Sequence, residues 1–392
     1  MQYSSNPEPV GIAIYFIKQQ GLTKRKTFNM MSESAFRKRF HLPNRFAEPG
    51  HPMSRSQDRI TIDHVAERAG VSPATVSRVI NQSAGVSEEK AAQVWAAIRE
   101  LDYVPHAAAQ TLAANRTHTL GLLLPAISGG FFVSMLAGIE TGLEETGFDL
   151  LIYSTRTTTD PHARMRRPLG EHNTDGLLVF ADSLDEAELQ RLADRDFPVV
   201  LLHRSAPDGT DIPTVTFENK SGARKAVDHL IDVHHRRHIV YVAGPEQHED
   251  SYWRRRGYRE SLDAHGIPFD PVLVVAGNFE EAPADAAISD LLSAGIDFDG
   301  VFSGDDESAI GVMNALQRAG RRIPQDVSVV GFDDVEISRH LTPPLTTIHA
   351  PIETAGLEAV RQLVQLVRTG SAEPLVLLPT DLVIRQSCGC TA

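Results

Sequence analysis

The chain of 392 residues has only two cysteines, Cys388 and Cys390, and both lie near its end. So few cysteines exclude a disulfide framework and favour a reducing compartment. A C-x-C pair by itself is too little to hold a metal ion. We therefore predict neither a metal site nor a cofactor.

Long hydrophobic runs are also missing. The longest early apolar run, Val10 to Ile17, spans eight residues, follows Glu8 and precedes Lys18. A signal peptide has the opposite order, with positive charge first and a longer apolar core. No segment approaches the roughly 18 to 20 apolar residues that a membrane-spanning helix needs. We therefore expect a cytoplasmic protein.

Positive charge is scarce, with 38 Lys and Arg against 51 Asp and Glu, and the formal net charge is -13. The imbalance is uneven: residues 1–59 carry +6, residues 60–116 carry -1 and residues 117–392 carry -18. The hydrophobic fraction of 42% is ordinary for a globular chain of two or three domains. A strongly acidic body repels nucleic acid, so any contact with DNA must be confined to a small part of the chain whose shape fits the DNA.

Residues 1–57 show no sustained hydrophobic period and contain five prolines. We predict that they form a flexible N-terminal extension. One interpretation is a basic arm that follows DNA phosphates. The other, which we favour, is that translation starts at Met53 and leaves a short tail before the first helix.

Two short helices joined by a glycine-containing turn are predicted from residue 61 onward. Thr61 is a good N-cap, and apolar residues recur with helical spacing at positions 62, 65, 66 and 69. Gly70 ends this helix, Ser72 caps the next, and Pro73 suits a first helical position. This arrangement is a helix-turn-helix, and a third helix from Ser87 closes a small core.

The second helix carries small and polar side chains that suit a DNA surface. Arg78 can donate two hydrogen bonds to guanine O6 and N7, and Ala74 is small enough to approach a thymine methyl. Hydroxyl side chains serve base edges or phosphates. Taken alone, the same pattern also occurs in ordinary helical bundles, so both interpretations stay open at this point. The residues on or near the polar side are Pro73, Ala74, Thr75, Ser77, Arg78 and Asn81.

An alanine-rich segment, HAAAQTLAANRT, begins at His106. Its only large apolar side chain is Leu112, so a helix here is marginal in isolation. Small residues such as Ala109 permit close approach to a minor groove, and Leu112 can wedge between base pairs. We predict a hinge helix over residues 105–116.

The remainder, residues 117–392, alternates buried strands with helices and does so twice. RHIVYVAGP repeats HTLGLLLP, so that Pro245 lies 120 residues after Pro125. We predict two similar lobes, each a parallel sheet flanked by helices. Lobe 1 is expected at about 118–217 and 349–375, and lobe 2 at about 218–345 and 376–388. The segment 341–351 is expected to be a loop crossing between them.

Ligands of such sheets bind beyond the carboxyl ends of the strands. Charged groups facing a cleft exchange hydrogen bonds with hydroxyls, and an aromatic ring covers apolar CH faces, so a polyhydroxylated ligand is expected. Asp305 or Asp306 can equally well cap the helix that follows. The histidines of HHRRH, residues 234–238, are expected on a solvated surface. The candidate residues for binding this ligand are Phe131, Phe132, Arg156, His203, Arg204, Arg254, Phe279, Asp305 with Asp306, and Asp333 with Asp334.

The stretch TIDHVAERAGVSPATVSRVINQSAGVSEEKAAQVWAAIRELDYVPHAAAQTLA resembles the headpiece of the lactose/galactose repressor (LacI/GalR) family without a gap. The similarity continues to the C-terminus. It implies an all-α helix-turn-helix headpiece at 58–104 and a hinge helix. It also implies an α/β two-lobed periplasmic-binding-protein-like body at 117–392 for effector binding and dimerisation.

The same resemblance implies roles for single residues. Thr61, Ser77 and Asn81 would anchor phosphates, Pro73, Ala74 and Arg78 would face bases, and Leu112 would insert at the operator centre. In the body, Arg254 and Asp333 would contact the effector and Phe279 would stack on it. This chain has His106 where the family usually has asparagine, His203 where aspartate is common, and Asp305 where asparagine is common.

We accordingly predict a sequence-specific transcriptional regulator, a repressor, that binds a palindromic operator as a homodimer or tetramer. A sugar or sugar derivative would control it, and it would join the nucleoid when bound to operator. The alternative is a sugar-binding protein of a transport system. An enzyme is disfavoured because the body lacks a G-x-S-x-G, a P-loop and a zinc motif.

Overall fold

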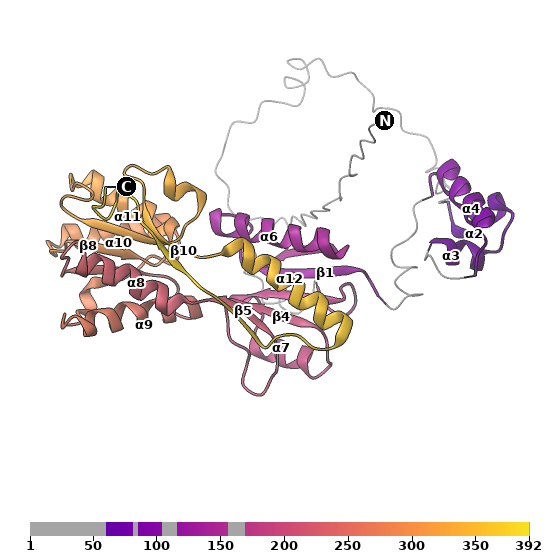
Figure 1. Ribbon diagram of the computed structural model, residues 1–392, viewed down its shortest axis with the longest axis horizontal. Helices are drawn as coiled ribbons and strands as arrows, with labels where there is room; N and C mark the ends of the chain where they lie inside the picture. Colours follow the sequence, from indigo (N-terminus) through magenta and orange to yellow (C-terminus); the bar gives the residue numbers. More distant parts are fainter. Residues whose placement is uncertain (1–59, 81–84, 104–115, 156–168, 392) are drawn as a thin grey trace, which may run out of the picture. The chain divides into compact units, whose positions relative to one another are not determined.

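The computed structural model describes residues 60–80, 85–103, 116–155 and 169–391. These form two compact units, one before and one from His118, and both appear in Figure 1. Several predictions fall outside the described residues: the extension at 1–57, residues 105–115 of the hinge helix with His106, Ala109 and Leu112, and the candidates Asn81 and Arg156.

In its described residues, the N-terminal unit has three helices around one small core. Gly70 ends the first helix with a φ of 65°, a left-handed conformation that glycine adopts without strain. Ser72 caps the second, because its Oγ accepts the N–H of Thr75 at 3.2 Å. The predicted helix-turn-helix with a supporting third helix is confirmed. The helices are α2 (Ile62–Ala69), α3 (Pro73–Ile80) and α4 (Glu88–Leu101), and Val65, Val76 and Val94 are fully buried between them.

The second unit contains two six-stranded sheets, ordered β11-β5-β4-β3-β1-β2 and β12-β10-β9-β8-β6-β7. Strands β1 to β5 are arranged in the first sheet as β6 to β10 are in the second, so the predicted repeat is confirmed. All pairings are parallel except that of β10 with β12. The first sheet holds β1 (Thr119–Leu124), β2 (Asp149–Ser154), β3 (Gly176–Phe180), β4 (Val199–Leu202), β5 (Thr214–Phe217) and β11 (Leu375–Leu378). The second holds β6 (Ile239–Ala243), β7 (Val274–Ala276), β8 (Gly300–Ser303), β9 (Ser328–Asp333), β10 (Thr346–His349) and β12 (Asp381–Val383).

Helices cover both faces of the second sheet. Alternate residues of β6 face opposite ways: Ile239 and Tyr241 pack toward α8 and α9, whereas Val240 and Val242 pack toward α10 and α11. Strands buried on both faces explain the continuous apolar runs in the sequence. The helices of this unit are α6 (Gly130–Thr146), α7 (Glu186–Ala193), α8 (Asn219–Asp232), α9 (Glu249–Ala264), α10 (Glu281–Ser293), α11 (Asp306–Arg318) and α12 (Ile352–Thr369), with short 3-10 turns η2 (Ala181–Ser183), η3 (Pro271–Leu273) and η4 (Glu336–Arg339). None of the described helices has both the length and the apolar character needed to cross a bilayer.

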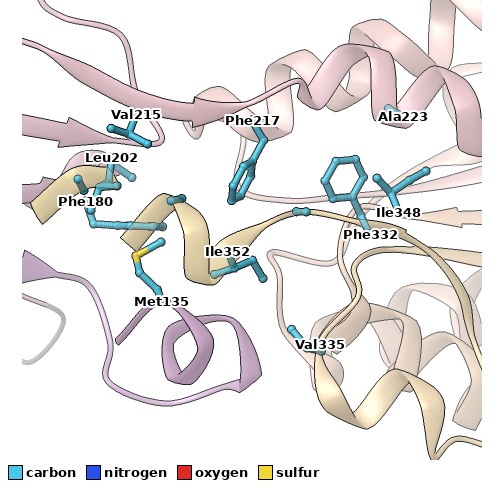
Figure 2. Close-up of a cluster of buried hydrophobic side chains, with 14 of the residues drawn as sticks. Met135, Phe180, Leu202, Val215, Phe217, Ala223, Phe332, Val335, Ile348 and Ile352 are labelled. Atoms are coloured by element: carbon cyan, nitrogen blue, oxygen red, sulfur yellow. The ribbon is translucent and has the colours of Figure 1, made fainter. Parts of the chain in front are cut away.

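The chain crosses between the lobes after β5, after β10 and after β11 (Figure 1). The prediction of a loop over 341–351 was wrong in part, because residues 346–349 form β10 between β9 and β12. Strand β11 pairs with β5, so the first lobe extends to residue 378 rather than 375. Figure 2 shows apolar side chains of both lobes in one cluster, among them Phe217 from β5 and Phe332 from β9.

Helices α6 and α12 cross with their backbones in direct contact. A Cβ on Gly138 would lie 1.8 Å from the carbonyl oxygen of Glu353, and one on Gly356 would lie 2.3 Å from that of Met135.

We expect Gly138→Ala to push the helices apart and lower the free energy of unfolding of the body by about 1–3 kcal/mol, measured by chemical denaturation. The control Ala137→Ser, at an exposed site of α6, should stay within about 0.5 kcal/mol of the wild type. An unchanged Gly138→Ala would contradict this close packing.

Candidate functional site

Helix α3 is held by one face and leaves the other open. Val76 and Val79 are buried in the headpiece core, whereas Pro73, Ala74 and Arg78 are exposed. Ser72 is also exposed, and Thr75 and Ser77 are partly so. The exposed face of α3 therefore carries the small and polar residues that were predicted to lie on it.

The beginning of α3 differs from that of its neighbours. Asp63 lies in the first turn of α2, and Glu88 and Glu89 lie in the first turn of α4, but α3 has no acidic residue there. Its positive dipole end is therefore left for an anionic partner. Thr61 is exposed at the start of α2, where its backbone N–H donates to Nδ1 of His64 at 3.1 Å. Both helix starts offer polar groups that suit a phosphate backbone.

The body has a cavity of about 600 Å³ between its lobes, at the carboxyl ends of the strands. Residues that follow β1, β2 and β3 line one wall, and the segments after β6, β7 and β8 line the other together with the end of β9. This is the place where open parallel sheets bind ligands. Six predicted effector residues line it: Phe131, Phe132, Arg254, Phe279, Asp305 and Asp333.

Arg254 is the centre of a buried polar network under this cavity. Its side chain is 2% exposed, and its guanidinium donates to Asn219 Oδ1 at 2.8 Å, to the Gly304 carbonyl at 2.5 Å and to Asp333 Oδ1 at 3.3 Å. The guanidinium carbon lies 3.7 Å from the ring centroid of Phe332. With each nitrogen bonded and one face on an aromatic ring, this arginine is held in a single orientation.

Asp250 was not identified from the sequence, yet it completes the network. Its carboxylate accepts from Asn219 Nδ2 at 2.8 Å and lies 2.8 Å from His203 Nδ1. His203 is fully buried among phenylalanine rings and does not line the cavity, so it acts on the site through Asp250. Asp250 lies in the first turn of α9, one turn before Arg254, a spacing that places both on one helix face.

The carboxyl groups around Arg254 differ in protonation. Burial raises the pKa of Asp333 to about 8, although Arg254 opposes the rise. Burial also raises the pKa of Asp305 to about 6, against the opposing hydrogen bond from Ser308. Burial would raise the pKa of Asp250 as well, but the charge and hydrogen bond of His203 lower it well below its usual range. Of these three carboxyls, Asp250 is therefore ionised, whereas Asp305 and Asp333 titrate near neutrality.

The two aspartate pairs of the sequence are divided between different tasks. Asp305 caps α11 by accepting the N–H of Ser308 at 3.2 Å, as predicted, and it also lines the cavity, so its position is compatible with a contact to the effector. Asp306 points away and accepts from Thr347 Oγ1 at 2.6 Å and from the N–H of Val335 at 3.0 Å. Asp334 bonds to Arg385.

Arg204 is not brought to the cavity. Its guanidinium donates to the carbonyl oxygens of Ala181 and Leu184 at 3.2 and 3.0 Å, within the first lobe. It borders a separate hollow beside η2. Arg204 was predicted to contact the effector because it directly follows a strand. That position does not fix the direction of such a long side chain.

Unusual backbone conformations gather where the strands end at the cavity. Asn278 and Phe279 have φ values of 56° and 59°, and Asp333 has 107°. Positive φ is uncommon for such residues and clusters at functional sites. Gly244 makes room for the aromatic ring, because a Cβ there would lie 2.1 Å from Phe279 Cζ. The fold therefore holds the Phe279 ring over the cavity at a conformational cost.

The raised pKa of Asp305 predicts a pH-dependent stability. A folded-state pKa of about 6 against an ordinary 3.8 means that the folded protein binds this proton more tightly. The stabilising contribution is present at low pH and is lost as the pH rises from 3.8 through about 6. Asparagine keeps the cap and never ionises. We expect Asp305→Asn to exceed the wild type in free energy of unfolding by about 2 kcal/mol at neutral pH and to match it in acid.

Urea denaturation across this pH range measures the effect. Asp263→Asn, at an exposed site of α9, is the control and should show no such divergence. A difference between Asp305→Asn and the wild type that stays constant with pH would show that ionisation of Asp305 is not its origin.

Two known protein families match parts of the chain. The family described as "Bacterial regulatory proteins, lacI family" matches residues 61–106, which include α2, α3 and α4. The family described as "Periplasmic binding protein-like domain" matches residues 227–388, which include most of the second lobe.

Characterised relatives match over nearly their whole length. The HTH-type transcriptional regulator CelR of Thermobifida fusca is 35% identical over 338 residues, 84% of this chain and 98% of that protein. The ribose operon repressor of Escherichia coli strain K12 is 35% identical over 329 residues, 83% and 98% of the two chains. The transcriptional repressor PurR of Aliivibrio fischeri strain MJ11 is 32% identical over 331 residues, 83% of this chain and 98% of that protein.

Solved structures of the same architecture are similar to this one. A lac repressor dimer bound to operator and the anti-inducer ONPF has a TM-score of 0.75 at 28% identity, covering 84% of this chain and 99% of that chain. A complex of CelR with cellobiose has a TM-score of 0.63 at 34% identity, covering 84% and 100%. Both matches extend over the headpiece and the two-lobed body together.

Proposed function

Because this chain belongs to the lacI family of bacterial regulatory proteins, we propose that it represses transcription by binding operator DNA under the control of a small-molecule effector. The observation that carries the proposal is the pairing, in one chain, of an exposed α3 with a polar cavity between two lobes. Its relatives are transcriptional regulators by name. We assign it no enzymatic activity and place it with DNA in the cytoplasm, in the nucleoid when bound to operator.

Within the headpiece, the exposed face of α3 reads the operator. Arg78 and the Pro73–Ala74 pair face base edges in the major groove, and Thr61, Ser72, Thr75 and Ser77 contact phosphates or base edges. Asn81 and the hinge residues His106, Ala109 and Leu112 complete the DNA contacts in this proposal. The headpiece has almost no net charge, so binding depends on fit more than on general attraction to DNA.

The regulator acts as a homodimer in this proposal, and two dimers can form a tetramer. One headpiece, with the three helices described, offers too little surface for the affinities typical of specific DNA binding. Two copies of α3 related by twofold symmetry read the half-sites of a palindrome. The lac repressor structure is that of a dimer on its operator, which supports the same arrangement here.

The effector is a neutral sugar or sugar derivative. Seven of the described residues that line the cavity are acidic and one, Arg254, is a permanent cation, so an acidic ligand is disfavoured. Carboxyl groups of Asp250, Asp305 and Asp333 bond to hydroxyls, while the Phe279 ring covers an apolar sugar face. The solved complex of CelR with cellobiose supports a carbohydrate ligand.

Effector and operator are coupled through the relative position of the lobes. A ligand that contacts residues of both walls favours one lobe arrangement over another, and this shifts the geometry of the paired hinges. By linkage, operator binding must alter effector affinity by the same factor.

Selection of bound sequences from random DNA with the full chain tests the proposal directly. We expect a palindromic site to be enriched, and one sugar from a panel of neutral sugars and sugar acids to change its affinity. Failure to enrich any sequence would refute DNA recognition. Enrichment with a response only to an acidic metabolite would refute the effector class alone.

A further inference from the structure

Two histidines and two cysteines come together in the second lobe, outside the residues that line the effector cavity. His229 lies in the last turn of α8 and His234 in the turn that follows it. Cys388 and Cys390 lie in the C-terminal turn after β12. One donor atom from each side chain lies within 4.8 Å of every other. The proposed regulatory function uses none of these residues.

The three distances among His229, His234 and Cys390 are close to the edges of a metal-centred tetrahedron, and Cys388 Sγ lies within 4.8 Å of the other donor atoms. Nε2 of His229 is 3.2 Å from Nε2 of His234, and Sγ of Cys390 lies 3.4 Å from the latter and 3.7 Å from the former. Zinc bonds of about 2.0 Å to nitrogen and about 2.3 Å to sulfur give tetrahedral edges of about 3.3 Å between nitrogens and about 3.5 Å between nitrogen and sulfur. The two rings are inclined by 75°, so their Nε2 atoms converge while the rings do not stack.

The C-terminal turn is held in place around Cys388. Its carbonyl accepts from Ser328 Oγ at 2.6 Å, and Ser387 bonds to Val329 through both its hydroxyl and its carbonyl. Thr346 Oγ1 accepts the N–H of Arg385 at 2.9 Å and lies 3.1 Å from Cys388 Sγ. Its own proton is therefore directed at the sulfur, the kind of hydrogen bond that supports a metal-bound thiolate.

Gly389 lets the two cysteines approach the histidine pair. Its φ is 117°, and a Cβ at this position would lie 3.0 Å from Nδ1 of His234. Cys388 and His229 are buried, while Cys390 and His234 are partly exposed. An ion therefore has a path from solvent and a site that then encloses it.

We propose that His229, His234, Cys388 and Cys390 bind a structural zinc ion that fastens the C-terminal turn to the end of α8. Two thiolates and two neutral imidazoles are a donor set that zinc prefers, and they neutralise its charge. The spacing His-x4-His falls within the range of zinc ligand pairs. Four protein ligands leave no open position, so the site stabilises the lobe and performs no chemistry.

Metal analysis of the full chain tests the assignment. The protein is produced in zinc-supplemented medium with a tag free of histidine, dialysed against metal-free buffer and measured by plasma mass spectrometry. We expect about one zinc per chain in the wild type and below about 0.1 in Cys390→Ser and in His234→Gln, because removal of one ligand from a four-ligand site abolishes tight binding. Cobalt added to the metal-free protein should give the visible spectrum of a tetrahedral thiolate complex.

His238→Gln is the matched control, since His238 belongs to the same HHRRH segment, is exposed and is not one of the four clustered donors. It should keep its zinc. Far-ultraviolet circular dichroism shows whether each variant is folded, and both ligand substitutions are at partly exposed sites. The proposal is overturned by a wild type with two titratable thiols and no metal, by a Cys388–Cys390 disulfide detected by mass, by another metal in place of zinc, or by folded ligand variants that retain zinc.

Discussion

Arg254→Ala is expected to lower the free energy of unfolding of the body by about 3–5 kcal/mol and to abolish effector binding. The substitution removes the hydrogen-bond donor of Asn219 Oδ1, of the Gly304 carbonyl and of Asp333 Oδ1, all in a buried site. Uncompensated burial of such groups costs more than the ion pair itself contributes. Chemical denaturation measures the stability, and calorimetry with the identified effector measures binding.

Two further variants separate stability from recognition. Arg255→Ala removes an exposed neighbouring arginine of α9 and should change neither quantity. Arg254→Lys keeps the charge but loses the planar, multiply bonded guanidinium, so it should fold and bind the effector more weakly. If Arg254→Ala stayed as stable as the wild type, the network would not hold the lobe as described. If Arg254→Lys bound effector normally, the guanidinium geometry would not serve recognition.

Arg78→Ala is expected to remove most of the discrimination between operator and unrelated DNA. A bidentate arginine contact to guanine contributes about 1–3 kcal/mol of discrimination, and a dimer makes it in both half-sites. The change leaves the headpiece folded, because Arg78 is exposed and its core neighbours Val76 and Val79 are untouched. Fluorescence anisotropy on the selected operator and on a scrambled duplex, at one salt concentration, measures the ratio of the two affinities.

The control is Arg99→Ala, which removes an exposed positive charge from α4. This variant should slightly lower the affinity for both the operator and the scrambled duplex, and it should leave the ratio of the two affinities unchanged. An Arg78→Ala variant that loses the same factor on both duplexes would assign Arg78 to phosphate contact and leave base recognition to other residues of α3.

Much of this molecule follows from local sequence patterns. The helix-turn-helix was predictable because caps and breakers at Thr61, Gly70 and Ser72 act within a few residues of the chain. The repeat of Pro125 and Pro245 reflects a strand order that the two sheets share. The strand β10 was missed because a short Thr-rich segment beside two prolines gives a turn signal, and only pairing with β9 and β12 makes it a strand.

Side-chain partners were harder to foresee. His203, Asn219 and Asp250 are far apart along the chain, and only His203 was a candidate from the sequence, yet the three are linked by hydrogen bonds to one another and to Arg254. The same is true of His229 with His234 and of Cys388 with Cys390. From the sequence, His234 was expected on a solvated turn, and the cysteines formed an isolated C-x-C. The four donor atoms come together only because β12 brings the end of the chain beside α8.

The headpiece, the acidic two-lobed body and the exposed face of α3 can all be predicted from the chain before it folds. These depend on hydrophobic period, capping and charge, which act over short distances along the chain. Only the folded structure shows which carboxyls face the cavity, that Arg204 turns away from it and that the histidine pair meets the cysteine pair. Those outcomes depend on burial and on the direction of each side chain, which are properties of packing between segments that the chain brings together only on folding.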